Sequence, residues 1–302
     1  MGTTLQKGTL FTPEQTNELI TLVRGKSTLA RLSASEPMPF NGKDMFTFNL
    51  DSEVNLVGES DAKANGGGTI TAVSMVPVKV EYGLRVSDEF KYGADEIKLQ
   101  YLAAFVDGFG KKVARGLDIM AFHGVNPRTG SSASSLSDKN FDAVVTNKVE
   151  FDEANVNTNI ETAIAMVETA EHDVTGIAMA PACKTALAQL KKGSTSYEPL
   201  YPELAWGNAP GTLNGLPIDS NSTVSFNRNA DRAIVGNFRD YFKWGFSTQI
   251  PLEVIEYGDP DNTGRDLKGH NEVYLRGEAY IGWGIIVPEA FAKVRDEDPA
   301  SV

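Results

Sequence analysis

Apolar residues recur every three or four positions through residues 94–123, and this spacing predicts one long α-helix. The apolar positions on one face of it are Leu99, Leu102, Val106, Phe109, Val113, Leu117 and Met120. The opposite face is expected to carry Lys98, Lys111, Lys112, Arg115 and Asp118. A helix of this length runs roughly 45 Å, and Gly124 supplies its stop. We therefore expect it to act as a structural spine.

Two stretches of alternating apolar and polar residues, 45–57 and 69–86, predict a long β-hairpin. The segment between them, residues 59–68, is polar and rich in glycine, so it cannot be buried. An isolated pair of strands is only marginally stable in water. We therefore expect the hairpin to lie on a partner, which another subunit could supply.

The remaining patterns predict a mixture of helices and strands, and hence an α+β fold. A capping signal predicts a short helix over residues 12–24, and small residues with a proline turn predict an extended arm over 27–42. Helices are expected over 156–171 and 181–192, around a strand at 176–180. Further strands are expected at 216–218, 232–236, 241–246 and 252–256. The last block, 272–294, predicts strands that turn at Gly282, Trp283 and Gly284.

Composition and charge narrow the classes of protein that fit. The 302 residues contain 41% hydrophobic residues, enough for one large core or two modest ones. We find no run of 18 uncharged apolar residues and no signal peptide, so we expect a protein of the cytoplasm without a membrane span. The net charge of −12 disfavours tight nucleic-acid binding, because such binding depends on neutralising phosphates. A protein that only surrounds nucleic acid remains compatible with this charge.

Candidate chemistry is sparse. The single cysteine, Cys183, lies in an apolar helical setting that is typical of an inert buried thiol. The three histidines, His123, His172 and His270, fall in separate segments without a metal-binding spacing. Residues 259–264 resemble the start of a calcium loop with glycine in sixth place, but His270 occupies the twelfth place, where a glutamate belongs. An acidic turn is the favoured interpretation, and the sequence predicts no catalytic, cofactor or metal site.

The order of several segments resembles the major capsid proteins of tailed bacteriophages, which have the Hong Kong 97 fold. The segments that carry the resemblance are 11–14, 27–32, 57–59, 86–89, 117–124, 213–218, 233–238 and 287–291. No single motif is specific, and their order along nearly the whole chain supports the assignment. The resemblance implies a structural subunit and no enzyme or cofactor.

The resemblance also implies a division into parts. Residues 1–43 are expected to form an N-terminal arm, and 44–85 an extended loop built as a β-hairpin. Residues 86–150 and 257–302 are expected to form a peripheral domain with the spine helix, and 151–256 an axial domain. At the tip of the extended loop, Glu59, Asp61 and Lys63 are candidates for contacts between subunits.

The function implied by the resemblance is that of a virion capsid subunit. It would be made in the cytoplasm of the host bacterium and assemble as hexamers and pentamers into an icosahedral shell around double-stranded DNA. Separate scaffolding, portal and decoration proteins are possible partners, and no membrane is involved. An encapsulin-type nanocompartment is the alternative with the same fold, and a cytoplasmic enzyme or binding protein is the remote one.

Overall fold

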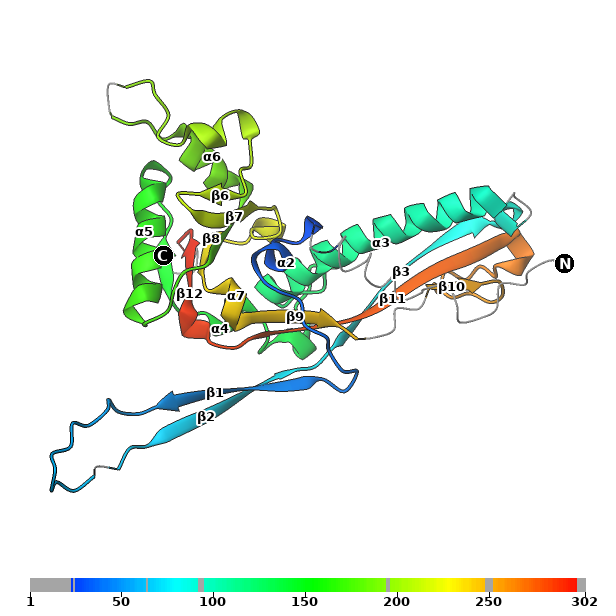
Figure 1. Ribbon diagram of the computed structural model, residues 1–302. Helices are drawn as coiled ribbons and strands as arrows, with labels where there is room; N and C mark the ends of the chain where they lie inside the picture. Colours follow the sequence, from blue (N-terminus) through cyan, green and yellow to red (C-terminus); the bar gives the residue numbers. More distant parts are fainter. Residues whose placement is uncertain are drawn as a thin grey trace.

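The computed structural model describes residues 23, 25–63, 65–91, 95–193, 196–247 and 252–297. The helix expected over residues 12–24 therefore lies almost entirely outside the described residues. Figure 1 shows an elongated molecule, with a helix-and-sheet arm on one side, a second sheet with two helices on the other, and a projecting hairpin. The predicted α+β class is confirmed.

The spine helix α3 spans Asp95–His123, close to the predicted bounds. Four of the predicted apolar positions are buried in the larger hydrophobic core, namely Phe109, Val113, Leu117 and Met120. Leu102 and Val106 are half-buried, and the side chain of Leu99 lies outside the described residues. The helix ends where predicted, because the Gly124 amide donates to the Met120 carbonyl at 2.9 Å and Gly124 has a φ of +63°.

The spine helix lies along an antiparallel sheet in the order β10–β11–β3, in which β9 also pairs with β11 (Figure 1). These strands span Leu252–Ile255 (β10), Glu272–Ile285 (β11), Val78–Ser87 (β3) and Phe242–Phe246 (β9). The rings of Phe105 and Phe109 pack closely over Gly277 of β11, where a Cβ would lie 3.2 Å from Phe109. The long helix therefore gains its stability from an extended apolar contact with β11.

A second sheet, with strand order β4–β12–β8–β5–β7–β6, forms the other part of the molecule. Its strands span Lys148–Glu150 (β4), Phe291–Arg295 (β12), Asp231–Gly236 (β8), Gly176–Met179 (β5), Leu216–Ser220 (β7) and Thr212–Leu213 (β6). Helices α5 (Val156–Thr169) and α6 (Pro181–Gln189) pack on it through a separate hydrophobic core. Two short helices, α4 (Phe141–Val144) and α7 (Phe238–Tyr241), lie near the junction of the two sheets.

Two groups of strands pair outside the parts of the chain that were expected to contain them. Strands β9 and β10 join the sheet of the spine helix, although they were expected in the axial part. Strand β12 joins the other sheet, although it was expected in the peripheral part.

The strand expected over 69–86 is two strands, β2 (Gly68–Met75) and β3, because Pro77 lacks the amide that would continue the ladder. The hairpin itself therefore ends at Met75.

The expected turn at Gly282–Trp283–Gly284 is wrong, because β11 runs unbroken through these residues. The glycines serve close packing instead of a turn. A Cβ at Gly282 would overlap Met38 Sδ, and one at Gly284 would lie 2.6 Å from the side chain of Met75. Both methionines come from segments before β3, so these glycines let the N-terminal part of the chain cross β11.

The segment expected as an extended arm over 27–42 begins with a helix, α2 (Thr28–Leu32), which Ser27 caps. Beyond it the chain is held against β9, where the Glu36 amide donates to the Trp244 carbonyl at 2.8 Å. Gly245 makes this approach possible, because a Cβ there would overlap the Glu36 carbonyl oxygen. The arm is thus part of the folded body from residue 27 onward.

Two glycine-to-alanine changes are expected to have opposite effects on stability. Gly108 lies inside α3, and a Cβ there would meet no atom within 4 Å, so Gly108→Ala should stabilise the protein by about 0.5–1 kcal/mol through helix propensity. Gly245→Ala should destabilise it by about 1–3 kcal/mol, because the arm must move away from β9. Thermal melting of both variants beside the parent checks this. Equal shifts in melting temperature would contradict the packing assigned to Gly245.

Candidate functional site

The hairpin of β1 (Lys43–Leu50) and β2 is the part of the structure that most needs a partner. Its strands pair from Lys43 opposite Met75 to Leu50 opposite Gly68, and within the described residues they form a two-stranded sheet of their own. Figure 1 shows the hairpin extending well past the body of the molecule, with residues 51–63 and 65–67 at its far end. Such a ribbon has no core of its own.

One face of this ribbon is apolar and exposed. Phe48 lies opposite Ile70, Phe46 lies opposite Ala72 and Leu50 lies opposite Gly68, so the side chains of these strand positions share one face. The exposed fractions of Phe46, Phe48, Leu50 and Ile70 are 69%, 62%, 71% and 65%. Exposed apolar side chains that gather in one place mark interaction surfaces. We call Phe46, Phe48, Leu50 and Ile70 the apolar face of the hairpin.

The opposite face of the ribbon is polar toward the tip and packs on the body at the base. Thr47 lies opposite Thr71, and Asn49 lies opposite Thr69. At the base, Met75 is fully buried against Gly284 of β11. The ribbon is therefore fixed to its own subunit by one face, and it presents the apolar face elsewhere.

The predicted contact residues Glu59, Asp61 and Lys63 lie in the exposed closing segment. Asp61 is partly engaged in a local turn, because its Oδ2 accepts from the Gly58 amide at 3.1 Å and its own amide donates to the Gly58 carbonyl at 3.2 Å. Their role between subunits stays a prediction. Sequence analysis singled out these charges and passed over the apolar face, although the alternation of Phe46, Phe48 and Leu50 was the available signal.

A buried carboxylate joins the arm to the spine helix. Asp118 is fully buried, contrary to its expected place on the solvent face of the helix. Its carboxylate accepts hydrogen bonds from the amides of Thr28 at 2.9 Å and Leu29 at 3.2 Å. It also accepts from the hydroxyls of Ser27 at 2.5 Å and Thr223 at 3.0 Å. Burial raises the pKa of Asp118 to about 6, against these hydrogen bonds, which lower it.

A second buried polar cluster lies at the junction of the two sheets, around His123 at the end of α3. His123 Nε2 donates to the Thr223 carbonyl at 2.9 Å, and Nδ1 lies 2.9 Å from Asp142 Oδ2. Burial alone would lower the pKa of His123, but the hydrogen bond and charge of Asp142 outweigh it and the pKa is raised. Asp231, also fully buried, has a pKa raised to about 7 by burial and by Asp142.

This cluster contains residue types that can bind a metal ion. One ligand atom each of His123, Asp142 and Asp231 lies within 4.8 Å of the others, which brings together residues that sequence analysis left unconnected. However, Lys293 Nζ lies 3.5 Å from Asp142 Oδ1, and Arg295 Nε lies 3.6 Å from Asp231 Oδ1. Cations of the protein itself thus lie beside both carboxylates, and we interpret the cluster as a structural joint between α3, α4, β8 and β12.

The fold also places Cys183 and His172, two other residues that the sequence singled out. Cys183 is buried in the smaller core, and burial raises the pKa of its thiol to about 12, as befits an unreactive cysteine. The ring of His172 stacks edge-on against Tyr241 at 5.2 Å. In the described part of the chain, no helix has the length and apolar character needed to cross a membrane.

Comparison with known proteins agrees with this arrangement. The Phage capsid family matches residues 7–296. A solved structure from Mycobacterium phage Ogopogo is 29% identical, covers 98% of this chain and 97% of its own, and superposes with a TM-score of 0.76. One from Gordonia phage Cozz is 23% identical, with coverages of 90% and 87% and a TM-score of 0.71. No curated protein matches the chain.

A more distant structure, from the capsid of an empty GTA particle, shares the fold. It is 12% identical, covers 99% of this chain and 95% of its own, and has a TM-score of 0.64. The match over nearly the full length of both chains shows that the two proteins share the overall fold.

Proposed function

We propose that this chain, which belongs to the phage capsid family and is a major capsid protein, helps to close a shell. In this proposal the apolar face of each hairpin lies on a neighbouring copy of the chain. The observation that carries the proposal is the exposure of Phe46, Phe48, Leu50 and Ile70 on a ribbon that the described part of its own subunit leaves uncovered. Each subunit would give one hairpin and receive another. Contacts of this head-to-tail kind close into rings when the rotation between copies allows it.

The energy of one such contact favours assembly only in a closed array. Burying an exposed Phe, Leu or Ile side chain contributes about 1.5–3 kcal/mol, so these four side chains contribute roughly 6–12 kcal/mol. Association of two proteins costs about 4–15 kcal/mol in lost freedom. A single hairpin contact is therefore close to break-even, and a subunit held by several neighbours is stable. This balance suits a shell that must correct errors while it grows.

The enclosed genome is proposed to be held by closure of the shell. The net charge of −12 repels phosphates on average, so sequence-specific or tight DNA binding is not proposed. We propose hexamers and pentamers as the building units, with separate scaffolding, portal and decoration proteins as partners. The chain would be made in the host bacterial cytoplasm and end in the virion. An encapsulin-type compartment is not favoured, since the family and the similar structures are those of phage capsids.

The division into parts is proposed in the terms of the resemblance. Residues 1–43 would be the arm, 44–85 the extended loop, 86–150 with 257–302 the peripheral domain, and 151–256 the axial domain. The strand exchanges between the two sheets mean that the last two are tied together by β9, β10 and β12. Glu59, Asp61 and Lys63 would pair with opposite charges on the neighbour, each contributing little by itself because it is exposed.

The direct test is to express the chain and examine the purified protein by negative-stain electron microscopy and by light scattering. We expect closed particles or rings of subunits, and nuclease-resistant DNA in particles recovered from an infected host. A folded chain that stays monomeric at every concentration, with and without a phage lysate as a source of scaffold, would contradict the proposal. Particles filled with a copurifying enzyme in place of DNA would favour the encapsulin-type alternative.

A further inference from the structure

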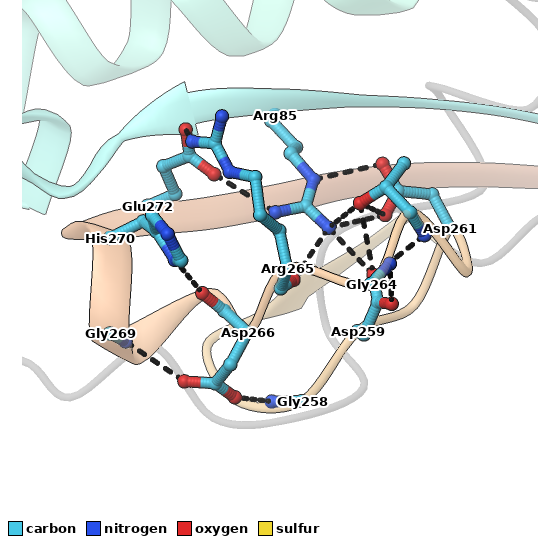
Figure 2. A network of polar contacts seen from close by, with 11 residues as sticks. Arg85, Gly258, Asp259, Asp261, Gly264, Arg265, Asp266, Gly269, His270 and Glu272 are labelled. Atoms are coloured by element: carbon cyan, nitrogen blue, oxygen red, sulfur yellow. Dashed lines mark hydrogen bonds and ion pairs between the residues drawn. The ribbon is translucent and has the colours of Figure 1, made fainter.

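The Arg85 guanidinium of β3 shows how the subunit neutralises a cation within its own fold. Figure 2 shows that the acidic turn predicted over residues 259–264 surrounds this guanidinium. Nη2 of Arg85 donates to Asp259 Oδ1 at 2.7 Å and also pairs with Asp261. Nη1 donates to Glu272 at 3.0 Å. The positive charge of Arg85 is therefore offset inside the subunit and is not offered to a partner.

A group of cations on and beside the spine helix lacks such partners. Lys112 and Arg115 lie three positions apart on α3, so their side chains share one face. Lys112 and Lys26 are exposed, and Arg115 is half-buried. Among the described residues, no carboxylate lies within ion-pair distance of these three side chains. The neighbouring Lys111 pairs only with Asp107 of the same helix, at 2.5 Å. We call Lys26, Lys111, Lys112 and Arg115 the basic face.

Contacts with one loop bring Lys26 and Arg115 together. The side-chain amide of Asn221 donates to the Lys26 carbonyl at 3.2 Å, and Arg115 Nη1 donates to the hydroxyl of Ser222 at 3.0 Å. These two loop residues directly follow β7, and Figure 1 shows α2 beside the second half of α3. The Arg115 guanidinium also lies over the Phe226 ring, 5.7 Å from its centroid. This packing orients the guanidinium before any partner arrives.

The carboxylates nearest to the basic face are directed into the protein. Asp118, three positions after Arg115, is fully buried and accepts from the Thr28 amide. Asp219 of β7 is 8% exposed, and it is bound by Arg31 and by the Thr28 hydroxyl. The fold therefore keeps these negative charges inside and the cations at the surface. The result is a locally positive surface on a chain whose net charge is −12.

We propose that the basic face binds the phosphate backbone of double-stranded DNA and therefore lines the inside of the shell. This inference rests on the proposed function, which supplies the enclosed DNA as the partner. Lysine and arginine contacts with phosphates carry non-specific DNA binding. A protein partner would need apolar or aromatic anchors, and the described residues of the basic face and its loop include no large apolar side chain that is exposed. The chemistry of this surface thus matches phosphates.

The contact is weak for a single subunit and acts through the number of copies. Non-specific DNA binding has a Kd of about 10⁻⁴–10⁻⁶ M at physiological salt, and the net charge of −12 places this chain at the weak end of that range. Closure of the shell still holds the genome. The basic face holds the outermost layer of DNA against the wall without reading its sequence, and each contact exchanges quickly enough for DNA to enter and leave.

The test titrates the full-length chain, cleared of particles by centrifugation, into a fluorescein-labelled duplex of about 20 base pairs. Fluorescence anisotropy is measured from about 20 to about 150 mM NaCl. The parent should bind with a slope of log Kd against log [NaCl] of about 3, as expected for three or four phosphate contacts. Lys26→Gln combined with Lys112→Gln should lower this slope by about 1.8 and weaken binding by about 10-fold or more at about 50 mM NaCl. Its melting temperature should not change, because both side chains are exposed and unpaired.

The matched control is Lys148→Gln combined with Lys191→Gln. It removes the same charge from two exposed lysines in the part of the molecule that contains the second sheet. This control should keep both the slope and the affinity of the parent. Equal weakening by the two double variants, or a parent that does not bind the duplex at the lowest salt, would overturn the proposal.

Shell formation is scored separately, by electron microscopy. The Lys26 and Lys112 double variant keeps its hairpin and should still form shells. Parent shells from a chain without DNA affinity would refute the basic face and leave the proposed function standing. DNA binding through these lysines by a chain that never forms shells would support the basic face and refute the proposed function.

Lysine acetylation of particles distinguishes DNA from a protein that covers the same face. In particles filled with DNA, Lys26 and Lys112 should react more slowly than in the same particles emptied of DNA, as read by mass spectrometry. Lys148 should react equally in both. Equal reactivity of Lys26 and Lys112 in filled and emptied particles would overturn the proposal, and slow reaction in both would assign the face to a protein partner.

Discussion

Asp118→Ala should unfold the arm from the spine helix and lower the stability of the whole subunit by about 2–4 kcal/mol. The change leaves the buried amides of Thr28 and Leu29 without their acceptor, and an unsatisfied buried donor costs about 1–3 kcal/mol. Relief of a buried charge offsets part of this loss. Thermal melting measures the loss of stability, and limited proteolysis near residue 27 should show release of the arm. Because domain stability is itself only about 5–15 kcal/mol, the effect should be large.

Two control variants separate the network from a general effect of removing an aspartate. Asp138→Ala removes an exposed aspartate and should leave melting unchanged within error. Asp118→Asn keeps the shape but can satisfy only one of the two amides, because its nitrogen cannot accept a hydrogen bond. It should therefore fall between the parent and Asp118→Ala. A melting temperature for Asp118→Ala equal to that of Asp138→Ala would refute the role assigned to the carboxylate.

The same carboxylate predicts how stability changes with pH. Its pKa in the folded protein is raised to about 6 by burial, above the unfolded value of 3.8. Between these values the folded state binds more protons, so the Asp118 contribution to stability rises as the pH falls from about 6 to about 4. Asp118→Asn lacks this titration, so the gap in stability between parent and variant should widen over that range. A gap that is constant from pH 7 to pH 4 would contradict the raised pKa.

The sequence predicted the elements whose apolar pattern is local. The spine helix, α5, α6 and three of the six strands of the second sheet, β5, β7 and β8, appear within a few residues of their expected bounds. In each, a periodic run of apolar residues meets a buried surface, and such a run reports the element without knowledge of its partner. Gly124 likewise ends α3 through its own backbone conformation.

The interactions that hold these elements together could not be predicted, because their partners are far apart in the chain. Asp118 accepts hydrogen bonds from residues 27–29 and from Thr223. A helical wheel does not show these remote donors, so it places the charged side chain on the solvent side. Gly282 permits the close approach of Met38, which is remote in sequence. Without knowledge of this contact, the glycine was interpreted as part of a turn. Arg85 meets Asp259 across 174 positions, and the loop without it looks like an acidic turn. In all three cases the local sequence supported one interpretation, and a contact with a residue far away in the chain gives the position a different role.

The sequence predicted the hairpin as an interaction surface but did not identify which of its residues make the contact. Sequence analysis recognised a hairpin without a core and expected a neighbouring copy to cover it. It named only the charged residues of the tip as candidates for the contact. The strand register was needed to show that Phe48 and Ile70 share one exposed face.

The largest effect on assembly should come from that face. Phe48→Gln combined with Ile70→Gln should leave the monomer folded, with an unchanged circular dichroism spectrum and melting temperature, but should prevent shells from forming. Both side chains are mostly exposed within the subunit, at 62% and 65%, so their loss costs the monomer little. In the shell the same change removes about 3–6 kcal/mol per hairpin contact, enough to tip a near break-even contact toward dissociation. Electron microscopy and light scattering of the assembled product provide the measurement.

The matched control is Thr47→Gln combined with Thr71→Gln, a directly opposed pair one position along on the other face of the same ribbon. It introduces the same side chains at the same depth of the hairpin, and shells should still form. Loss of shells in both double variants would mean that the hairpin matters only as a whole. Shells from the Phe48 and Ile70 variant would exclude the apolar face as the assembly contact.

A third variant separates the apolar face from the charged tip. Replacing residues 51–67 by Asn-Gly would join Leu50 to Gly68, which already face each other in register, through a two-residue turn that such strands favour. It removes Glu59, Asp61 and Lys63, together with the exposed side chains of Val54 and Leu56, and it keeps the four residues of the apolar face. Exposed ion pairs contribute only about 0–1 kcal/mol each and the four side chains of the apolar face remain, so this variant should still assemble, with reduced yield. If it fails to assemble while the face variant succeeds, the tip is the assembly contact and the apolar face is not.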